Sequence, residues 1–261
     1  MSLRVTLKRG IQKIVPCFLR EAIFRLGMAI GGDFAPGFAF RNYPEFSWLD
    51  HSLLALKKLG FAPRMIVDVG AYEGNWTKMV YEIYPEAQFL MVEPQESKKT
   101  ILQGVVQQLA PRVSLVSSLL GGEDQKSISF YPSETGSSVL PEIHSAGVPS
   151  QTLQMRTLAS ILNEKGFPVP DFIKLDVQGY ELEVLKGCKD LLKTASVVLL
   201  EVAVQPCNQG APSFNEVLDY MNEHDFIPFD FGTFFRSAND SRLRQVDLIF
   251  VRKDSNLHDR A

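Results

Sequence analysis

Two acids and two glycines in the first half of the chain are informative in type and in spacing. Asp68, Gly70 and Gly74 lie in the stretch Asp-Val-Gly-Ala-Tyr-Glu-Gly, and Glu93 follows Gly74 by nineteen residues. Glycine lets the backbone of such a turn approach a ligand closely, and an acid at the end of the following strand can accept both hydroxyls of a ribose. These four residues therefore predict a site for a cofactor that contains adenosine.

The glycine pattern distinguishes between the two kinds of cofactor with that feature. A dinucleotide fingerprint needs Gly-x-Gly-x-x-Gly to admit a pyrophosphate, whereas this turn reads Asp-x-Gly-x-x-x-Gly and lacks the Gly-x-Gly pair. The pattern favours S-adenosylmethionine. Tyr72, inside the turn, joins Asp68, Gly70, Gly74 and Glu93 as a predicted contact of this cofactor. An NAD-dependent oxidoreductase stays open as the alternative.

A third acid, Asp176, is the predicted catalytic residue. It lies near the end of the apolar stretch 171–177, where strand alternation places it on the same side as Lys174. Open α/β sheets bind their ligands beyond the carboxyl ends of the strands, so Asp176 is also a predicted cofactor contact. His144, in a long polar loop, is the second candidate for a general base. Glu201 ends another apolar run and is either a site residue or a partner of Lys174.

Strand and helix patterns alternate around these residues. This alternation predicts an α/β fold built on a doubly wound, mostly parallel sheet with helices on both faces. Residues 127–131 are expected to add a strand at an edge of the sheet, and residues 246–252 a last, antiparallel strand. Residues 181–192 are expected to form one helix, and the polar segment from about 132 to 150 a loop that faces the substrate.

Composition limits the class of protein. The 261 residues are 45% hydrophobic, which fits one large domain, and the net charge of −3 provides no general footprint for nucleic acid. Three cysteines and four histidines show neither a disulfide framework nor the spacing of metal ligands. We therefore expect a cytoplasmic protein without a metal, with a structured region at 61–253 and a polar tail at 254–261.

The amino-terminal residues 1–60 differ from the rest of the chain. Residues 3–15 carry an apolar helical stripe, and residues 1–32 contain six basic residues against one acid, a net charge of +5 that leaves −8 for the remainder. This pattern predicts a basic amphipathic helical arm followed by a connector. Through residues 1–30 the arm could contact the inner face of an anionic membrane, or it could pack on the domain or on a second subunit of a homodimer.

Four motifs follow one another in the chain. They are Asp68-Val-Gly-Ala-x-x-Gly74, Val92-Glu93-Pro94, Gly136-Ser-Ser-Val-Leu140, and the long stretch from Phe172 to Gly187 that reads Phe-Ile-Lys-Leu-Asp-Val-Gln-Gly-Tyr-Glu-Leu-Glu-Val-Leu-Lys-Gly. Over about residues 64–252 the chain resembles the FkbM-type family of S-adenosylmethionine-dependent methyltransferases. The resemblance implies a Rossmann-like, seven-stranded sheet with an antiparallel last strand, and O-methylation of a hydroxyl on a glycan or a natural product.

The chain departs from the family pattern at three positions. The family usually has Asn where this chain has Tyr72, Glu where it has Gln178, and Asp where it has Ala159. The change at Gln178 removes a candidate acid or base, and the change at Ala159 removes an acid to which the pattern assigns no role. A binding protein that keeps the fold without turnover is therefore a second alternative to the methyltransferase.

Overall fold

The computed structural model describes residues 48–133, 136–143, 149–237 and 240–257. The predicted amino-terminal arm, His144 and the end of the predicted tail lie outside these residues, so their roles stay predictions. The described residues all fall in one compact unit, which begins at Trp48. Among them, no helix has both the length and the apolar character that crossing a membrane requires.

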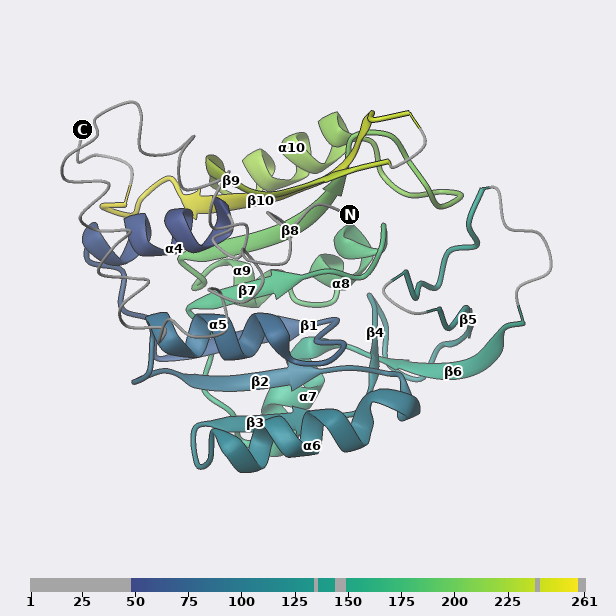
Figure 1. Ribbon diagram of the computed structural model, residues 1–261, viewed down its shortest axis with the longest axis horizontal. Coiled ribbons are helices and arrows are strands. Elements are labelled where there is room, and N and C mark those ends of the chain that lie inside the picture. Colours follow the sequence, from purple (N-terminus) through teal and green to yellow (C-terminus); the bar gives the residue numbers. More distant parts are fainter. Residues whose placement is uncertain (1–47, 134–135, 144–148, 238–239, 258–261) are drawn as a thin grey trace, which may run out of the picture. The chain divides into compact units, whose positions relative to one another are not determined.

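A seven-stranded sheet forms the centre of the molecule, in the order β3-β2-β1-β7-β8-β10-β9 (Figure 1). Its strands are β1 Met65–Val69, β2 Gln88–Val92, β3 Val113–Val116, β7 Phe172–Leu175, β8 Val197–Ala203, β9 Phe226–Arg236 and β10 Leu243–Arg252. Neighbouring strands from β3 to β8 are parallel, and β10 runs antiparallel to both β8 and β9. The predicted mostly parallel sheet with an antiparallel last strand is confirmed.

Helices cover both faces of the sheet because its central strands are apolar on both sides. One face packs against α4 Trp48–Lys58, α5 Asn75–Ile83 and α6 Lys99–Gln108, the last preceded by the 3₁₀ turn η2 Glu96–Lys98. The other face packs against α7 Leu158–Lys165, α8 Glu181–Lys186, α9 Lys189–Leu192 and α10 Phe214–Glu223. All five residues of β1 are buried, including Asp68. The doubly wound arrangement places the carboxyl ends of β1, β2 and β7 at one edge of the sheet.

The predicted single helix at 181–192 is two helices, α8 and α9, separated by Gly187 and Cys188. Gly187 lies against the backbone of the chain near Gly121, whose carbonyl oxygen would be only 2.3 Å from a Cβ placed on Gly187. This contact leaves no room for a side chain. The helical apolar spacing continues through the break, which is why the sequence pattern did not reveal it.

The predicted edge strand at 127–131 belongs to a separate small sheet. β5 Ser127–Phe130 pairs antiparallel with β6 Gln151–Arg156, and β6 pairs parallel with β4 Leu119–Leu120. Phe130, Val139 and Met155 give this second sheet a small apolar core of its own. The expectation of an added edge strand in the main sheet was therefore wrong, because alternation reports a half-buried strand but not the sheet to which it belongs.

Candidate functional site

The turn after β1 requires glycine at Gly70. Its φ is +71°, and a Cβ there would lie 1.9 Å from the backbone carbonyl oxygen of Asp176. The N–H of Gly70 donates to the carbonyl of Val92 at 2.9 Å, so the turn is tied to the end of β2. Gly74 also has a φ of +71°, but the space beside its Cα is filled by the side chains of Met91, Leu102 and Val105, at 3.1 to 3.2 Å from an added Cβ. Gly70 thus faces the site, whereas Gly74 packs on the core.

Glu93 follows β2 and is held by backbone N–H groups. The N–H of Tyr72 donates to its Oε2 at 2.8 Å, and the N–H of Gln95 donates to its Oε1 at 3.0 Å. The residue is only 4% exposed, and burial raises the pKa of its carboxyl above the ordinary value despite these hydrogen bonds. Tyr72 has a φ of +50°, and the ammonium of Lys98 lies 3.9 Å from the centre of its ring.

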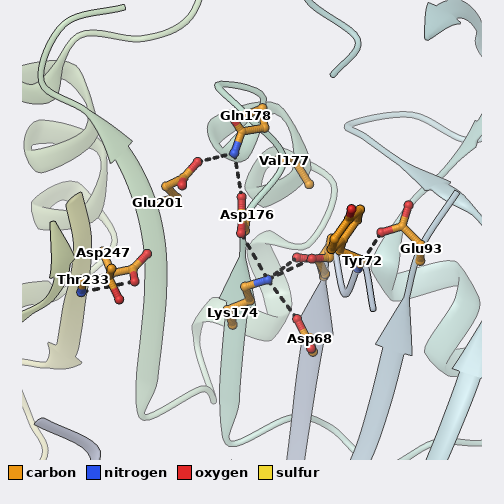
Figure 2. A network of polar contacts seen from close by, with 12 residues as sticks. Asp68, Tyr72, Glu93, Lys174, Asp176, Val177, Gln178, Glu201, Thr233 and Asp247 are labelled. Atoms are coloured by element: carbon orange, nitrogen blue, oxygen red, sulfur yellow. Dashed lines mark hydrogen bonds and ion pairs between the residues drawn. The ribbon is translucent and has the colours of Figure 1, made fainter. Parts of the chain in front are cut away.

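A buried ammonium joins the turn to the end of β7 (Figure 2). The Nζ of Lys174 lies 3.0 Å from Asp68 Oδ1 and 3.6 Å from Asp176 Oδ2, and it donates to the carbonyl of Gly70 at 3.0 Å. Thr77 donates its hydroxyl to the other oxygen of Asp68 at 2.6 Å. Burial alone would lower the pKa of Lys174, but Asp68 and then Asp176 outweigh it and raise the pKa above its ordinary value. Asp68 therefore supports the site through Lys174.

A row of amides and carboxylates continues from Asp176 across the next strands (Figure 2). The side-chain amide of Gln178 donates to Asp176 Oδ1 at 3.0 Å and to Glu201 Oε2 at 2.5 Å. Gln245 on β10 donates to the same Glu201 oxygen at 2.7 Å and to Gln178 Oε1 at 3.1 Å. Glu201 thus pairs with two amides, and the ammonium of Lys174 pairs with Asp68 and Asp176 instead. Burial, followed by the nearby carboxylate of Asp176, raises the pKa of Glu201 well above the ordinary value.

A pocket opens at the carboxyl ends of β1, β2 and β7. Its empty volume, counted with the space at its open mouth, is about 720 Å³. Gly70, Tyr72, Glu93 and Asp176 line it, whereas Asp68 and Gly74 do not. In the ranges that the structure covers, no group of three or more His, Cys, Asp or Glu side chains could hold a metal ion.

The segment 136–143 forms one wall of the pocket. Ser137, Ser138 and Val139 line it, and the hydroxyl of Ser138 donates to the carbonyl of Gln178 at 3.0 Å. The N–H of Ile143 donates to the carbonyl of Cys207 at 2.8 Å, which attaches the far end of the segment. Residues 137–139 of the predicted substrate-facing loop therefore line the pocket.

The family model for the methyltransferase FkbM domain matches residues 68–228. This range includes the turn, Glu93, the pocket wall and the Asp176 region. The chain belongs to the FkbM methyltransferase family. The resemblance inferred from the motifs is confirmed, and the matched range covers more than half of the chain.

Individual relatives of this FkbM methyltransferase are more distant. The hexuronic acid methyltransferase AglP of Haloferax volcanii is 32% identical over 75 residues, which are 29% of this chain and 30% of the relative. The methyltransferase FkbM of Methylobacillus flagellatus KT has a similar structure with a TM-score of 0.46 and 18% identity, covering 71% of this chain and 43% of that one. The magnesium protoporphyrin IX methyltransferase of Synechocystis PCC 6803, with bound SAM, has a TM-score of 0.44 and 12% identity, covering 78% and 80%. This chain thus spans less than half the length of the first two relatives.

Two acids of this FkbM methyltransferase were missed in the sequence. Glu181 is 2% exposed and accepts the N–H groups of Val177 and Gly179 at 3.0 and 3.1 Å, and burial raises its pKa to about 7. Asp247 on β10 accepts the N–H of Thr233 at 3.2 Å, and burial raises its pKa to about 6. Glu181 could have been recognised in the sequence, because it lies in the first turn of a helix just after a glycine turn, where an acid is favoured. Asp247 was harder to recognise in the sequence, because its one indication is that it interrupts an apolar strand.

The structure explains two of the departures from the family pattern. Tyr72 and Gln178 both have positive φ, at +50° and +57°. Asn tolerates this conformation better than most residues, which accounts for the usual Asn at the position of Tyr72. At position 178, an amide supplies two N–H groups to two carboxylates, whereas a Glu would place a third carboxylate beside them. Gln178 therefore changes the charge of the site and retains its place in the hydrogen-bonded row.

Proposed function

We propose that this FkbM methyltransferase transfers a methyl group from S-adenosylmethionine to a hydroxyl of a glycan or a natural product. The observation that carries the proposal is the pocket in which Gly70, Glu93 and Asp176 meet at the carboxyl ends of three strands. The alternatives are an NAD-dependent oxidoreductase and a binding protein without turnover. Both remain testable with the experiments below.

The residues of the turn fit an adenosyl cofactor. Glycine at Gly70 lets the turn pack on the backbone of Asp176, and the carboxylate oxygens of Glu93 have acceptor capacity beyond the hydrogen bonds that they accept from Tyr72 and Gln95. These oxygens would accept the two hydroxyls of a ribose. When bound, S-adenosylmethionine supplies an electrophilic methyl carbon on a sulfonium. The N–H groups that hold Glu93 come from the backbone, so its orientation is set before the ligand binds.

Asp176 is placed to orient the acceptor hydroxyl or to take its proton. Its carboxylate lies on the pocket wall and is held by Lys174 on one oxygen and by Gln178 on the other. Transfer of a methyl group is an in-line displacement, in which most of the acceleration can come from the position of the oxygen and from exclusion of water. The segment 136–143 closes one side of the pocket and would exclude water there. His144 remains the second candidate for the base.

The choice of a glycan over other acceptors rests on two supports. The relative from Haloferax volcanii is a hexuronic acid methyltransferase by name, although the match covers less than a third of it. The row formed by Asp176, Gln178, Glu201 and Gln245 carries carboxylate and amide oxygens, which can accept hydrogen bonds from sugar hydroxyls. The acceptor would lie over this row, with one hydroxyl directed at Asp176.

Calorimetry with S-adenosylmethionine tests the cofactor assignment. Glu93→Ala should weaken binding by about 1.5–3 kcal/mol, the usual range for a hydrogen bond to a charged group. Glu96→Ala is the matched control, because the Glu96 side chain is 77% exposed and pairs with Lys99 at the surface. Unchanged affinity in a folded Glu93→Ala variant would contradict the assignment.

Two further measurements separate the alternatives. Saturable binding of NADH, followed by nicotinamide fluorescence, would support the oxidoreductase. Binding of S-adenosylmethionine without transfer of its labelled methyl group to any glycan or extract component would support the binding protein. Transfer of the label to an acceptor hydroxyl supports the proposal.

A further inference from the structure

One exposed aromatic side chain shares a sheet face with the polar row. β10 alternates without a bulge along β8, so Gln245, Asp247 and Ile249 point to the same side. Ile249 packs in the core under α4 and α5, which identifies that side. Phe235 on β9 is the paired neighbour of Gln245, and paired residues of antiparallel strands point to the same face. Phe235 therefore lies on the face that carries the row.

Hydrogen bonds connect the pocket to Gln245, the residue that pairs with Phe235. Asp176 and Gln178 line the pocket, Gln178 contacts Glu201 and Gln245, and Gln245 is the register partner of Phe235. Three strand spacings of about 4.8 Å separate β7 from β9, so Phe235 lies roughly 14 Å across the sheet from the end of β7. Figure 1 shows β10 and β9 together at the border of the sheet opposite β3. The row thus extends from the pocket to an aromatic ring at that border.

Phe235 is unusually exposed for its type. Its exposed fraction is 56%, the largest among the exposed large hydrophobic residues of the described chain. Phe231 and Phe234 on the same strand are also exposed, but they pair with Leu248 and Val246, which belong to the core on the opposite face. Their rings stack on each other with centres 6.0 Å apart. Phe235 therefore exposes an aromatic ring on the face that carries the polar row.

We propose that Phe235 determines acceptor specificity by supporting a sugar ring that lies beyond the methylated unit. The proposal rests on the proposed function, and it narrows the acceptor to an oligosaccharide of about three units or more. The C–H face of a pyranose is apolar and gains from burial on an aromatic ring, while its hydroxyls would donate to the side-chain oxygens of Gln245 and Glu201. The family model ends at residue 228, so this contact is a feature of the chain outside the matched domain.

The test compares Phe235→Ala with Phe231→Ala. Phe231 is the matched control because it is an exposed phenylalanine, 45% exposed, on the same strand but the opposite face. The probes are labelled S-adenosylmethionine and an array of mono- to pentasaccharides with neutral, amino and uronic acid units. For methylated trisaccharides and longer glycans, Phe235→Ala should raise KM about tenfold with little change in kcat, the loss expected from part of a phenylalanine burial. Phe231→Ala should leave KM unchanged.

The possible outcomes distinguish a failure of the proposed role of Phe235 from a failure of the proposed reaction. Methylation of monosaccharides as efficient as that of trisaccharides would contradict the proposed role of Phe235, and so would a Phe235→Ala variant that matches the wild type on long glycans. Either result would leave the proposed glycan methyltransferase activity unaffected. If the protein binds S-adenosylmethionine but methylates no glycan on the array, both the proposed glycan acceptor and the proposed role of Phe235 are wrong. Equal melting temperatures of the two variants exclude an effect on folding.

Discussion

Glu93 and Asp176, two acids that line the pocket, are held by different means on the two halves of the sheet. On the half that we propose binds the cofactor (the cofactor half, formed by β1, β2 and β3), Glu93 accepts the backbone N–H groups of Tyr72 and Gln95. On the half that we propose faces the acceptor (the acceptor half, formed by β7, β8, β10 and β9), Asp176 and Glu201 are fixed mainly by side chains, those of Lys174, Gln178 and Gln245. Backbone donors remain when a side chain changes, whereas side-chain donors do not. The acceptor half can therefore be altered by single substitutions that would leave the cofactor half intact.

Lys174 is the group that connects the two halves. It pairs with Asp68 on β1 and with Asp176 after β7, and it donates to the turn at Gly70.

Lys174→Met should produce the largest loss. Removal of the ammonium leaves Asp68 fully buried without its cation, and breaking a buried pair from one side costs about 3–5 kcal/mol. The free energy of unfolding, measured with urea, should fall by this amount. Lys186→Met is the control, since Lys186 pairs with Glu183 at the surface and such pairs contribute less than about 1 kcal/mol. Equal losses in the two variants would show that Lys174 does not connect the halves.

Asp176→Asn should lower turnover and leave cofactor binding nearly unchanged. The change preserves shape and removes charge, so turnover should fall about a hundredfold or more, with affinity for S-adenosylmethionine nearly unchanged. Single-turnover kinetics and calorimetry measure the two quantities. A lower melting temperature with a parallel loss of cofactor binding would instead indicate a structural role. If His144→Ala abolishes turnover while Asp176→Asn retains it, the base lies at His144.

The sequence predicted which residues come together better on the cofactor half than on the acceptor half. Contacts on the cofactor half depend on glycine conformation and on the distance between two strand ends, and both leave a local pattern around Gly70 and Glu93. Of the predicted cofactor residues, the structure brings Gly70, Tyr72, Glu93 and Asp176 to the pocket. Asp68 and Gly74 have the predicted positions in the chain but serve Lys174 and the core.

Contacts on the acceptor half join residues far apart in the chain. Gln178 meets Gln245 across 67 positions, and Phe235 reaches the row only through the register of β9 on β10. A single sequence contains no periodicity that reports such pairs. The same limit explains why the small sheet around β6 and the break between α8 and α9 were not predicted, since both depend on tertiary packing.

Glu181 should make stability depend on pH on the acceptor half. Burial raises its pKa to about 7, above the ordinary value near 4.3. The folded state therefore binds its proton more tightly than the unfolded state, and stability is lost as pH rises from about 4.3 to about 7. Glu181→Gln removes this dependence and can still accept the N–H groups of Val177 and Gly179.

Urea unfolding of the wild type and of Glu181→Gln at several pH values measures the effect. The variant should gain on the order of 2 kcal/mol relative to the wild type between pH 4.5 and 7.5. Asp247 is present in both proteins, so its contribution cancels in the difference. Glu183→Gln controls for loss of an acid at an exposed position of the same helix. A difference between wild type and Glu181→Gln that does not change with pH would contradict the prediction.

Tyr72→Asn should have the smallest effect, because Tyr72 serves the cofactor half through its backbone. Asn accepts a φ of +50° more readily than Tyr, which favours the variant. Loss of the contact between Lys98 and the ring, at 3.9 Å, opposes this gain by about 0.5–1 kcal/mol. The gain in backbone preference and the loss of the Lys98 contact nearly cancel, so the free energy of unfolding should change by less than about 0.5 kcal/mol. The N–H of residue 72 still donates to Glu93, and calorimetry should therefore find affinity for S-adenosylmethionine within about threefold of the wild type. A tenfold loss would mean that the ring itself contacts the cofactor, and that the cofactor half also depends on a side chain.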